Sequence, residues 1–302
     1  MIFWSLFRRW LARPQRLSRL ELVRFLFPLA ALGFLSGRLL HADELLGETG
    51  FHVPDLGHDD WRQPLYLPPL PDTAAWLLAA LTVLAGICLS LGYRTRLAAL
   101  TFALLVAWIA LSDRLAAFTV TKLTPTLAFA LFFSSAGTRY SVDALLAQRR
   151  EPEADSPEFV RSGALCFIQL FLPIFYGCSA VFKARGDWLR EPYVLWTHVH
   201  DSYQTYFAWL LALITPLAVW HLLQLTIVAL EGLAPLWLGW RRTRPFALCG
   251  FLMMHVMIGL MFGPVKWFSL LMITLLLGGY LPDSQLLRVE AALGRLSSFA
   301  RR

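Results

Sequence analysis

Lys183 has the clearest chemical potential in this sequence. It follows a long apolar run, 164–182, and lies five residues before Trp188. Burial favours the neutral form of an amine, which can then act as a base at neutral pH. The alternative is an ordinary membrane interface, where Lys side chains reach toward the head groups and Trp rings lie beside them. Whether this amine is buried therefore decides whether the position can do chemistry.

Two more ionisable residues, Glu231 and His255, lie inside the apolar runs 227–235 and 251–259. Charged groups are costly at membrane depth, so such side chains usually face a partner or a water-filled cavity. We expect both side chains to face the protein interior. The sequence leaves open whether they are functional groups or hydrogen-bonding contacts between helices.

Metal-binding and nucleophilic patterns are weaker. His198, His200 and Asp201 lie close together, but no second set of ligands accompanies them, and we expect no metal site. The cysteines form no CxxC pair and all lie in apolar runs, which predicts buried thiols. They are Cys88, Cys166, Cys178 and Cys249. The sequence has no GxSxG, P-loop or dinucleotide-binding motif.

Membrane helices must position these residues. Of the 302 residues, 57% are hydrophobic and 16% are charged, whereas soluble domains carry about 25% charged residues. A spanning helix needs about 20 apolar residues, and about nine segments approach that length. The prediction is an all-α, polytopic transmembrane helix bundle with about eight to nine spans. The segments are 20–40, 74–92, 97–112, 119–136, 163–182, 204–222, 223–240, 246–263 and 267–281.

The stretch 204–240 is nearly continuous, and Pro216 and His221 mark its expected break, because Pro removes a helix hydrogen-bond donor. It forms either two spans or one crossing with a re-entrant piece. Two spans would place the basic run Arg241–Arg244 outside, and a single crossing would place it inside. Both alternatives remain open at the level of sequence.

Three regions follow one another along the chain. We predict a basic amphipathic interfacial segment at 1–19, the transmembrane domain at 20–285 and a basic C-terminal tail at 286–302. Arginine clusters in the first half indicate cytoplasmic loops, whereas the acidic loop 41–72 is expected outside. Lys183 would then lie at the outer face. The basic clusters suit lipid head groups, so the expected partner is a lipid bilayer and not nucleic acid.

Four short stretches follow one another in a characteristic order along the chain. They are Leu22–Phe25, Leu91–Arg94, Tyr140–Leu146 and Phe175–Trp188. Their order and spacing resemble the HTTM (horizontally transferred transmembrane) domain family, which includes the vitamin K-dependent gamma-glutamyl carboxylases. The likeness covers roughly residues 18–285, and Glu231, Arg241–Arg244 and His255 recur at similar places ahead of Phe268 and Ser269.

The resemblance implies a function. In the carboxylase a lysine five residues before a tryptophan is the proposed base that deprotonates a reduced quinone, and Lys183 matches that position. Glu231, His255 and Trp188 would then shape the cofactor site. The implied protein is a multi-pass enzyme of the bacterial inner (cytoplasmic) membrane. It would use a quinone of the vitamin K or menaquinone type and act on a peptide or protein substrate at the outer face.

A non-enzymatic membrane scaffold or partner protein is the alternative. Carboxylases of the family carry an Asn-His pair where this sequence has Thr121 and Lys122. We also expect no soluble substrate-capture domain after the last span. These two departures favour the scaffold, whereas Lys183, Glu231 and His255 favour the enzyme.

Overall fold

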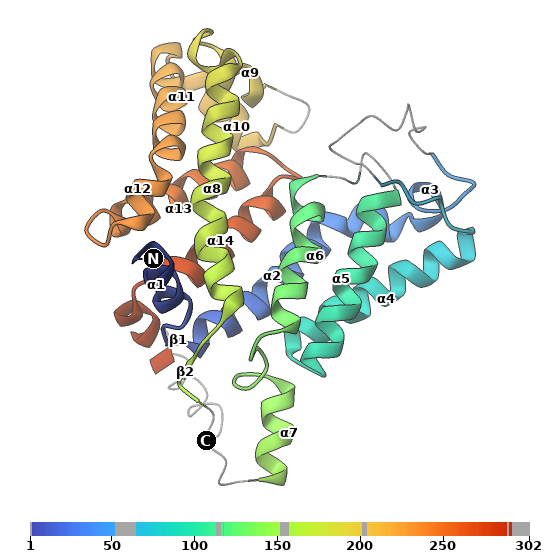
Figure 1. The fold of residues 1–302 in the computed structure, drawn as a ribbon. Coiled ribbons are helices and arrows are strands. Elements are labelled where there is room, and N and C mark those ends of the chain that lie inside the picture. The colour runs from blue at the N-terminus through green and yellow to red at the C-terminus, as the bar shows by residue number, and fades with distance from the viewer. Residues whose placement is uncertain are drawn as a thin grey trace, which may run out of the picture. The chain divides into compact units, whose positions relative to one another are not determined.

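The computed structural model is mostly helical, and it divides into two compact units, 1–164 and 165–302 (Figure 1). The prediction of a helical membrane protein with several spans is confirmed. The structure describes residues 2–51, 65–112, 116, 118–151, 157–200, 204–288 and 290–291. Asp201 and residues 52–64 of the acidic loop 41–72 lie outside the described residues.

Unit 1 contains the long helices of the first half and one very short strand pair. Its elements are α1 (Ile2–Leu11), β1 (Gln15–Arg16), α2 (Leu17–Leu40), α3 (Ala42–Leu45), α4 (Asp72–Leu91), α5 (Thr95–Ser112), α6 (Thr119–Phe132), α7 (Val142–Arg150) and β2 (Phe159–Val160). The strands β1 and β2 pair antiparallel, with Gln15 opposite Val160 and Arg16 opposite Phe159. This pair departs from the all-α prediction. It joins the segment before α2 to the segment before α8 (Gly163–Arg185).

Unit 2 contains most of α8. The elements that follow are η2 (Asp187–Leu189), α9 (Val194–Val199), α10 (Tyr206–Ile214), α11 (Leu217–Gly232), α12 (Ala234–Gly239), α13 (Arg244–Met261) and α14 (Lys266–Tyr280). α10 and α11 meet at Pro216 with a bend of 117°. The expected break at Pro216 is confirmed.

Five helices are long and apolar enough to cross a membrane, namely α2, α4, α5, α8 and α13. The bent pair α10–α11 raises the number to six if it forms one span. The predicted eight to nine spans are therefore not confirmed. The difference arises because 204–240 is broken, and because α6 and α14 have only 14 and 15 residues.

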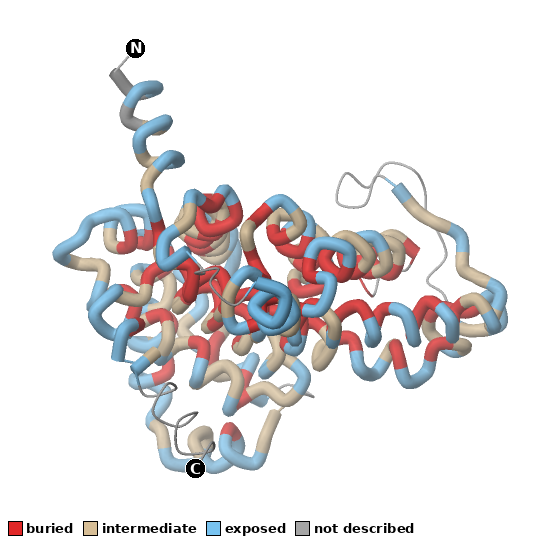
Figure 2. The backbone as a smooth tube through the Cα atoms, turned by 90° about the horizontal axis from the view of Figure 1, so that it is seen from below, coloured by how far each residue is buried: buried red, intermediate tan, exposed pale blue. Residues whose placement is uncertain are grey.

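Exposed positions on the long helices are largely apolar, as a lipid-facing surface requires. Figure 2 shows buried and exposed positions alternating along these helices. Leu77, Leu84 and Leu104 are more than half exposed. The prediction of four buried thiols is wrong for Cys178 and Cys249, which are exposed. An apolar side chain in a membrane protein can face lipid as readily as the core, so hydropathy alone does not separate the two.

A buried ion pair ties together one end of unit 1. Arg24 and Glu21 are 1% and 3% exposed, and Arg24 Nε donates to Glu21 Oε2 at 2.7 Å. The guanidinium also donates to Ser90 O at 2.5 Å and to Tyr140 O at 2.8 Å. Glu21 Oε1 accepts from the Gly137 amide at 2.9 Å. The start of α2 is thereby joined to the end of α4 and to the turn after α6.

Gly92 and Asp143 complete the same junction. Gly92 ends α4 with a φ of +70°, and a methyl group there would lie 2.7 Å from Arg24 Nη1, so both backbone and space call for glycine. The Asp143 carboxylate accepts from the Arg94 and Thr95 amides, each at 2.8 Å, and caps α5. Three of the four stretches that resemble the HTTM family therefore meet in one structural junction.

At the opposite end of unit 1, other contacts join α2 to α6 and α4 to α5. Phe34 of α2 stacks on Phe118, just before α6, with ring centroids 5.2 Å apart. The Leu67 amide, ahead of α4, donates to Leu111 O near the end of α5 at 2.9 Å. α2, α4, α5 and α6 thus run between the same two ends of unit 1, in alternating directions.

We expect the end that holds Arg24 to be cytoplasmic, since Arg94, Arg139 and Arg149 belong to the same side. In a background with all four cysteines replaced by Ser, a membrane-impermeant maleimide should label Glu48→Cys in intact cells. It should label Gln148→Cys, on α7, only after lysis. The opposite labelling pattern would reverse the topology.

The helices of unit 2 also alternate in direction. A methyl group at Gly177 would lie 3.6 Å from Pro235 of α12, and one at Gly232 would lie 3.6 Å from Ala180. The second half of α8 therefore packs closely against the end of α11 and the start of α12, which run in the opposite direction. Gln169 Nε2, near the start of α8, donates to Gly279 O at the end of α14 at 2.8 Å.

The basic run before α13 lies at the end of unit 2 where α8 begins. The Arg244 guanidinium sits 5.6 Å from the ring centroid of Tyr280, whose hydroxyl donates to Gln169 O near the start of α8. This placement is opposite to Lys183 at the other end of α8. It favours a single crossing for 204–240, the alternative in which Arg241–Arg244 lies inside.

Candidate functional site

One face of α8 carries the polar residues of the candidate site. Tyr176, Ser179 and Lys183 are spaced three and four residues apart, which places them on the same side of a helix. The rest of the helix is strongly apolar, and Pro173 within it is of the kind that membrane helices tolerate. This face is therefore the polar stripe of an otherwise lipid-compatible helix.

Lys183 and Glu231 form an ion pair between α8 and α11. Lys183 Nζ contacts both carboxylate oxygens of Glu231 at 2.6 Å, and it donates to Ser179 Oγ at 3.2 Å. The Lys183 side chain is 21% exposed and that of Glu231 is 6% exposed. The amine is thus largely withdrawn from water but still reachable.

Trp188 covers the amine. Its ring centroid lies 5.0 Å from Lys183 Nζ, within the range of a cation–π contact. The ring is half-buried and belongs to the short helix η2 that follows α8. Carboxylate, hydroxyl and aromatic ring together surround the amine on several sides.

His255 forms a second buried polar pair on α13. Its Nε2 atom lies 2.8 Å from the Tyr176 hydroxyl, and both residues are 1% exposed. The aromatic rings of Phe251 and Phe268 pack against the pair, with Phe251 stacked on Tyr176 at 4.1 Å. His255 Nδ1 has no hydrogen-bond partner among the described residues.

The geometry thus places three of the four predicted site residues, Lys183, Glu231 and Trp188, in direct contact. His255 lies in the adjoining pair. The HTTM domain model matches residues 13–278 of the chain, which is most of its length. This protein belongs to the HTTM family. No curated protein and no solved structure matched the chain.

An open apolar groove of ≈ 310 Å³ lies on the other side of α8 in the HTTM domain. Gly177 and Pro235 line this groove, and neither has a long side chain that would fill it. Lys183, Glu231, Trp188 and His255 do not line it. The remaining lining residues are Pro173, Ile174, Cys178, Val181 and Phe182.

The histidines of α9 take part in local contacts. His198 Nδ1 bonds Val194 O at 2.7 Å, and His200 Nδ1 bonds Trp196 O at 2.8 Å. Within the part of this HTTM protein that the structure describes, no group of three or more His, Cys, Asp or Glu residues could hold a metal ion.

Sequence reasoning missed Tyr176 and Gln224. Tyr176 looks like one more aromatic residue in an apolar run. Only its position seven residues, or two helical turns, before Lys183 indicates that both lie on the same face of a helix. Gln224 is 0% exposed in α11 of the HTTM domain. A polar residue within an apolar membrane run was the signal that identified Glu231, and it applies to Gln224 equally.

Proposed function

We propose that this HTTM-family protein is a membrane enzyme of the vitamin K-dependent gamma-carboxylase type, in which Lys183 accepts a proton from a reduced quinone. The proposal includes a peptide or protein substrate at the outer face and a location in a bacterial inner membrane. The observation that carries it is the shielded Lys183–Glu231 pair at the end of an apolar helix.

The pair can hold one transferable proton in two ways. In the ionic form the proton is on Lys183 Nζ and Glu231 is a carboxylate. In the neutral form the same proton is on Glu231, and the free amine can accept another from a substrate hydroxyl. The contact of 2.6 Å allows direct transfer between the two groups. Glu231 would thereby prepare Lys183 as the base, and Ser179 would orient the amine.

The residues present fit a reduced quinone, whose hydroxyl would supply an acidic proton when bound. Lys183 is partly exposed, so a hydroxyl can approach its amine. Trp188 offers an apolar aromatic plane beside it. Trp188, Glu231 and Lys183 would hold the polar end of the ring. His255 would support the site from behind, because its Nε2 is fixed by Tyr176.

The Lys183–Glu231 ion pair also suits the alternative, a scaffold in which these residues only hold α8 to α11. The presence or absence of a bound lipid-soluble cofactor distinguishes the enzyme from the scaffold. We expect organic extraction of the purified protein, followed by mass spectrometry, to yield quinone near one equivalent. Trp188→Ala should reduce this amount at least several-fold, whereas Trp240→Ala, at an exposed position outside the pair, should not. Equal and trace amounts in all three proteins would contradict the proposal.

We also propose that α6 and α14 cross the membrane. α6 and α14 are shorter than the six candidate crossings, yet each runs between the same two ends of its unit as its neighbours. Counting both as crossings would give eight. An even number keeps residues 1–19 and the C-terminal tail on the cytoplasmic side.

A further inference from the structure

Gln224 is a polar side chain with no exposed surface on an apolar helix. Its Oε1 accepts from the Leu195 amide at 2.9 Å. Its Nε2 donates to Trp188 O at 2.6 Å and to Glu191 O at 2.8 Å. One oxygen and both amide hydrogens are therefore used. All three bonds reach the segment 188–195, which connects α8 to α9.

In α11 polar side chains are buried and apolar side chains are exposed, which is the reverse of a helix in a soluble protein. Trp220, Gln224 and Glu231 are its buried residues, spaced four and seven apart, whereas leucines such as Leu222 face outward. The same face thus supplies Glu231 to the amine and Gln224 to the connecting segment. A membrane environment accounts for the outward leucines and makes the buried amide costly to leave unpaired.

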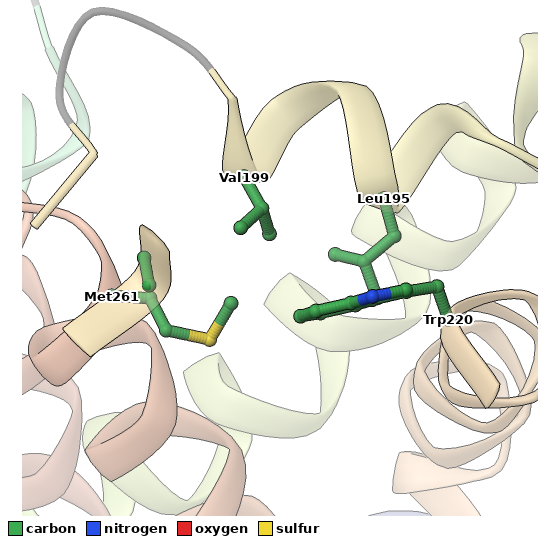
Figure 3. Close-up of a cluster of buried hydrophobic side chains, with 5 residues drawn as sticks. Leu195, Val199, Trp220 and Met261 are labelled. Carbon is green, nitrogen blue, oxygen red and sulfur yellow. The ribbon is translucent and has the colours of Figure 1, made fainter. Parts of the chain in front are cut away.

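A hydrophobic cluster fixes the far end of that segment. Leu195 and Val199 of α9 pack with Trp220 and Met261 (Figure 3), and Ala208 completes the buried set. Trp188 packs against the edge of this cluster. The segment 188–199 is thus held by hydrogen bonds at one end and by apolar packing at the other.

We infer that Gln224 is a positioning residue that holds the segment 188–199 as a strap over Lys183, with Trp188 as the covering ring. The Trp188 carbonyl bonds to Gln224, and its ring lies over the amine. Loss of the Gln224 bonds releases the carbonyl and lets the ring move away. The strap therefore controls which molecules reach the Lys183–Glu231 pair, whether or not that pair acts on a quinol.

Acetylation of lysine amines tests this inference in the full-length protein in detergent micelles. The reagent is the N-hydroxysuccinimide ester of acetic acid, and peptide mass spectrometry gives the rate at Lys183. Lys266 is the internal reference, since it lies 5.3 Å from the ring centroid of Trp267 and has no link to Gln224. Gln224→Met keeps a similar volume without the amide. Thr226→Val is the matched control on the same helix, because Thr226 is exposed and its hydroxyl donates to Leu222 O within α11.

We expect Gln224→Met to acetylate Lys183 about tenfold faster, as expected when about 1.4 kcal/mol of closing free energy is lost. Lys266 in every variant, and Lys183 in Thr226→Val, should keep their wild-type rates. Hydrogen exchange should rise in 188–199 but not in α14. A wild-type rate at Lys183 together with faster exchange in 188–199 would overturn the inference.

A second variant covers the case in which Gln224→Met does not fold. Trp188→Leu removes the covering ring but leaves the backbone carbonyl that Gln224 binds. We expect Lys183 acetylation to rise several-fold in this variant with Lys266 unchanged. No rise in Trp188→Leu would show that the strap does not shield the amine.

Discussion

Lys183→Arg should lower any quinol-linked turnover by about 10²- to 10⁴-fold, the usual contribution of a positioned general base. Guanidinium stays protonated in proteins, so Arg cannot accept the proton. It can still bind Glu231 through two parallel hydrogen bonds, so the fold should survive. Turnover with a reduced quinone and the midpoint of thermal unfolding, measured together, check both parts of this expectation.

The matched control is Lys266→Arg, at the other lysine of unit 2 that lies over a tryptophan ring. It should leave turnover unchanged. Glu231→Gln tests the proton-sharing model, because the amide cannot take the Lys183 proton, and it should lower turnover while retaining a hydrogen bond. Full activity in Lys183→Arg would exclude Lys183 as the base.

Arg24→Met should destabilise unit 1 by about 3–5 kcal/mol, the range for breaking a buried ion pair on one side. The substitution leaves the Glu21 carboxylate buried, and it removes the bonds to the ends of α4 and α6. We expect a large loss of folded protein in the membrane and a lower midpoint of thermal unfolding. Arg149→Met, on the exposed surface of α7, is the control and should have little effect.

The double variant Glu21→Leu/Arg24→Met shows whether the lost stability comes from the unpaired Glu21 carboxylate or from the lost hydrogen bonds of the junction. Replacing both charges by apolar side chains removes the unpaired carboxylate, so it should recover part of the lost stability. A double variant less stable than Arg24→Met would indicate that Glu21 contributes mainly through the Gly137 and Arg139 amides that it accepts from.

Hydropathy predicted the long helices well because a bilayer fixes their minimum length. The segment 163–182 became α8 (Gly163–Arg185), and 246–263 became α13 (Arg244–Met261). The same argument did not fix the number of spans, since it measures apolar length and not direction. Pro216 indicated the break in 204–240, but it did not predict the bend of 117° between α10 and α11.

The candidate site was only partly predictable for a similar reason. Lys183 and Glu231 each stood out as ionisable groups in apolar surroundings, yet 48 residues separate them, and periodicity within one helix says nothing about contacts between helices. The Tyr176–His255 pair spans 79 residues and was not predicted. Leu22–Phe25, Leu91–Arg94 and Tyr140–Leu146 were recognised as patterns, but the structure was needed to show that they form one junction.

That junction also constrains how the chain matures during synthesis. Glu21 and Arg24 can neutralise each other as soon as the first long helix forms, since they are one turn apart. The carbonyl of Tyr140 lies 116 residues later. At roughly 5–20 residues per second it emerges about 6–23 seconds after Arg24. The remaining donors of the guanidinium must be bound by water for that time, before the folding of unit 1 can be completed. The junction around this early ion pair is therefore completed by a late step in assembly.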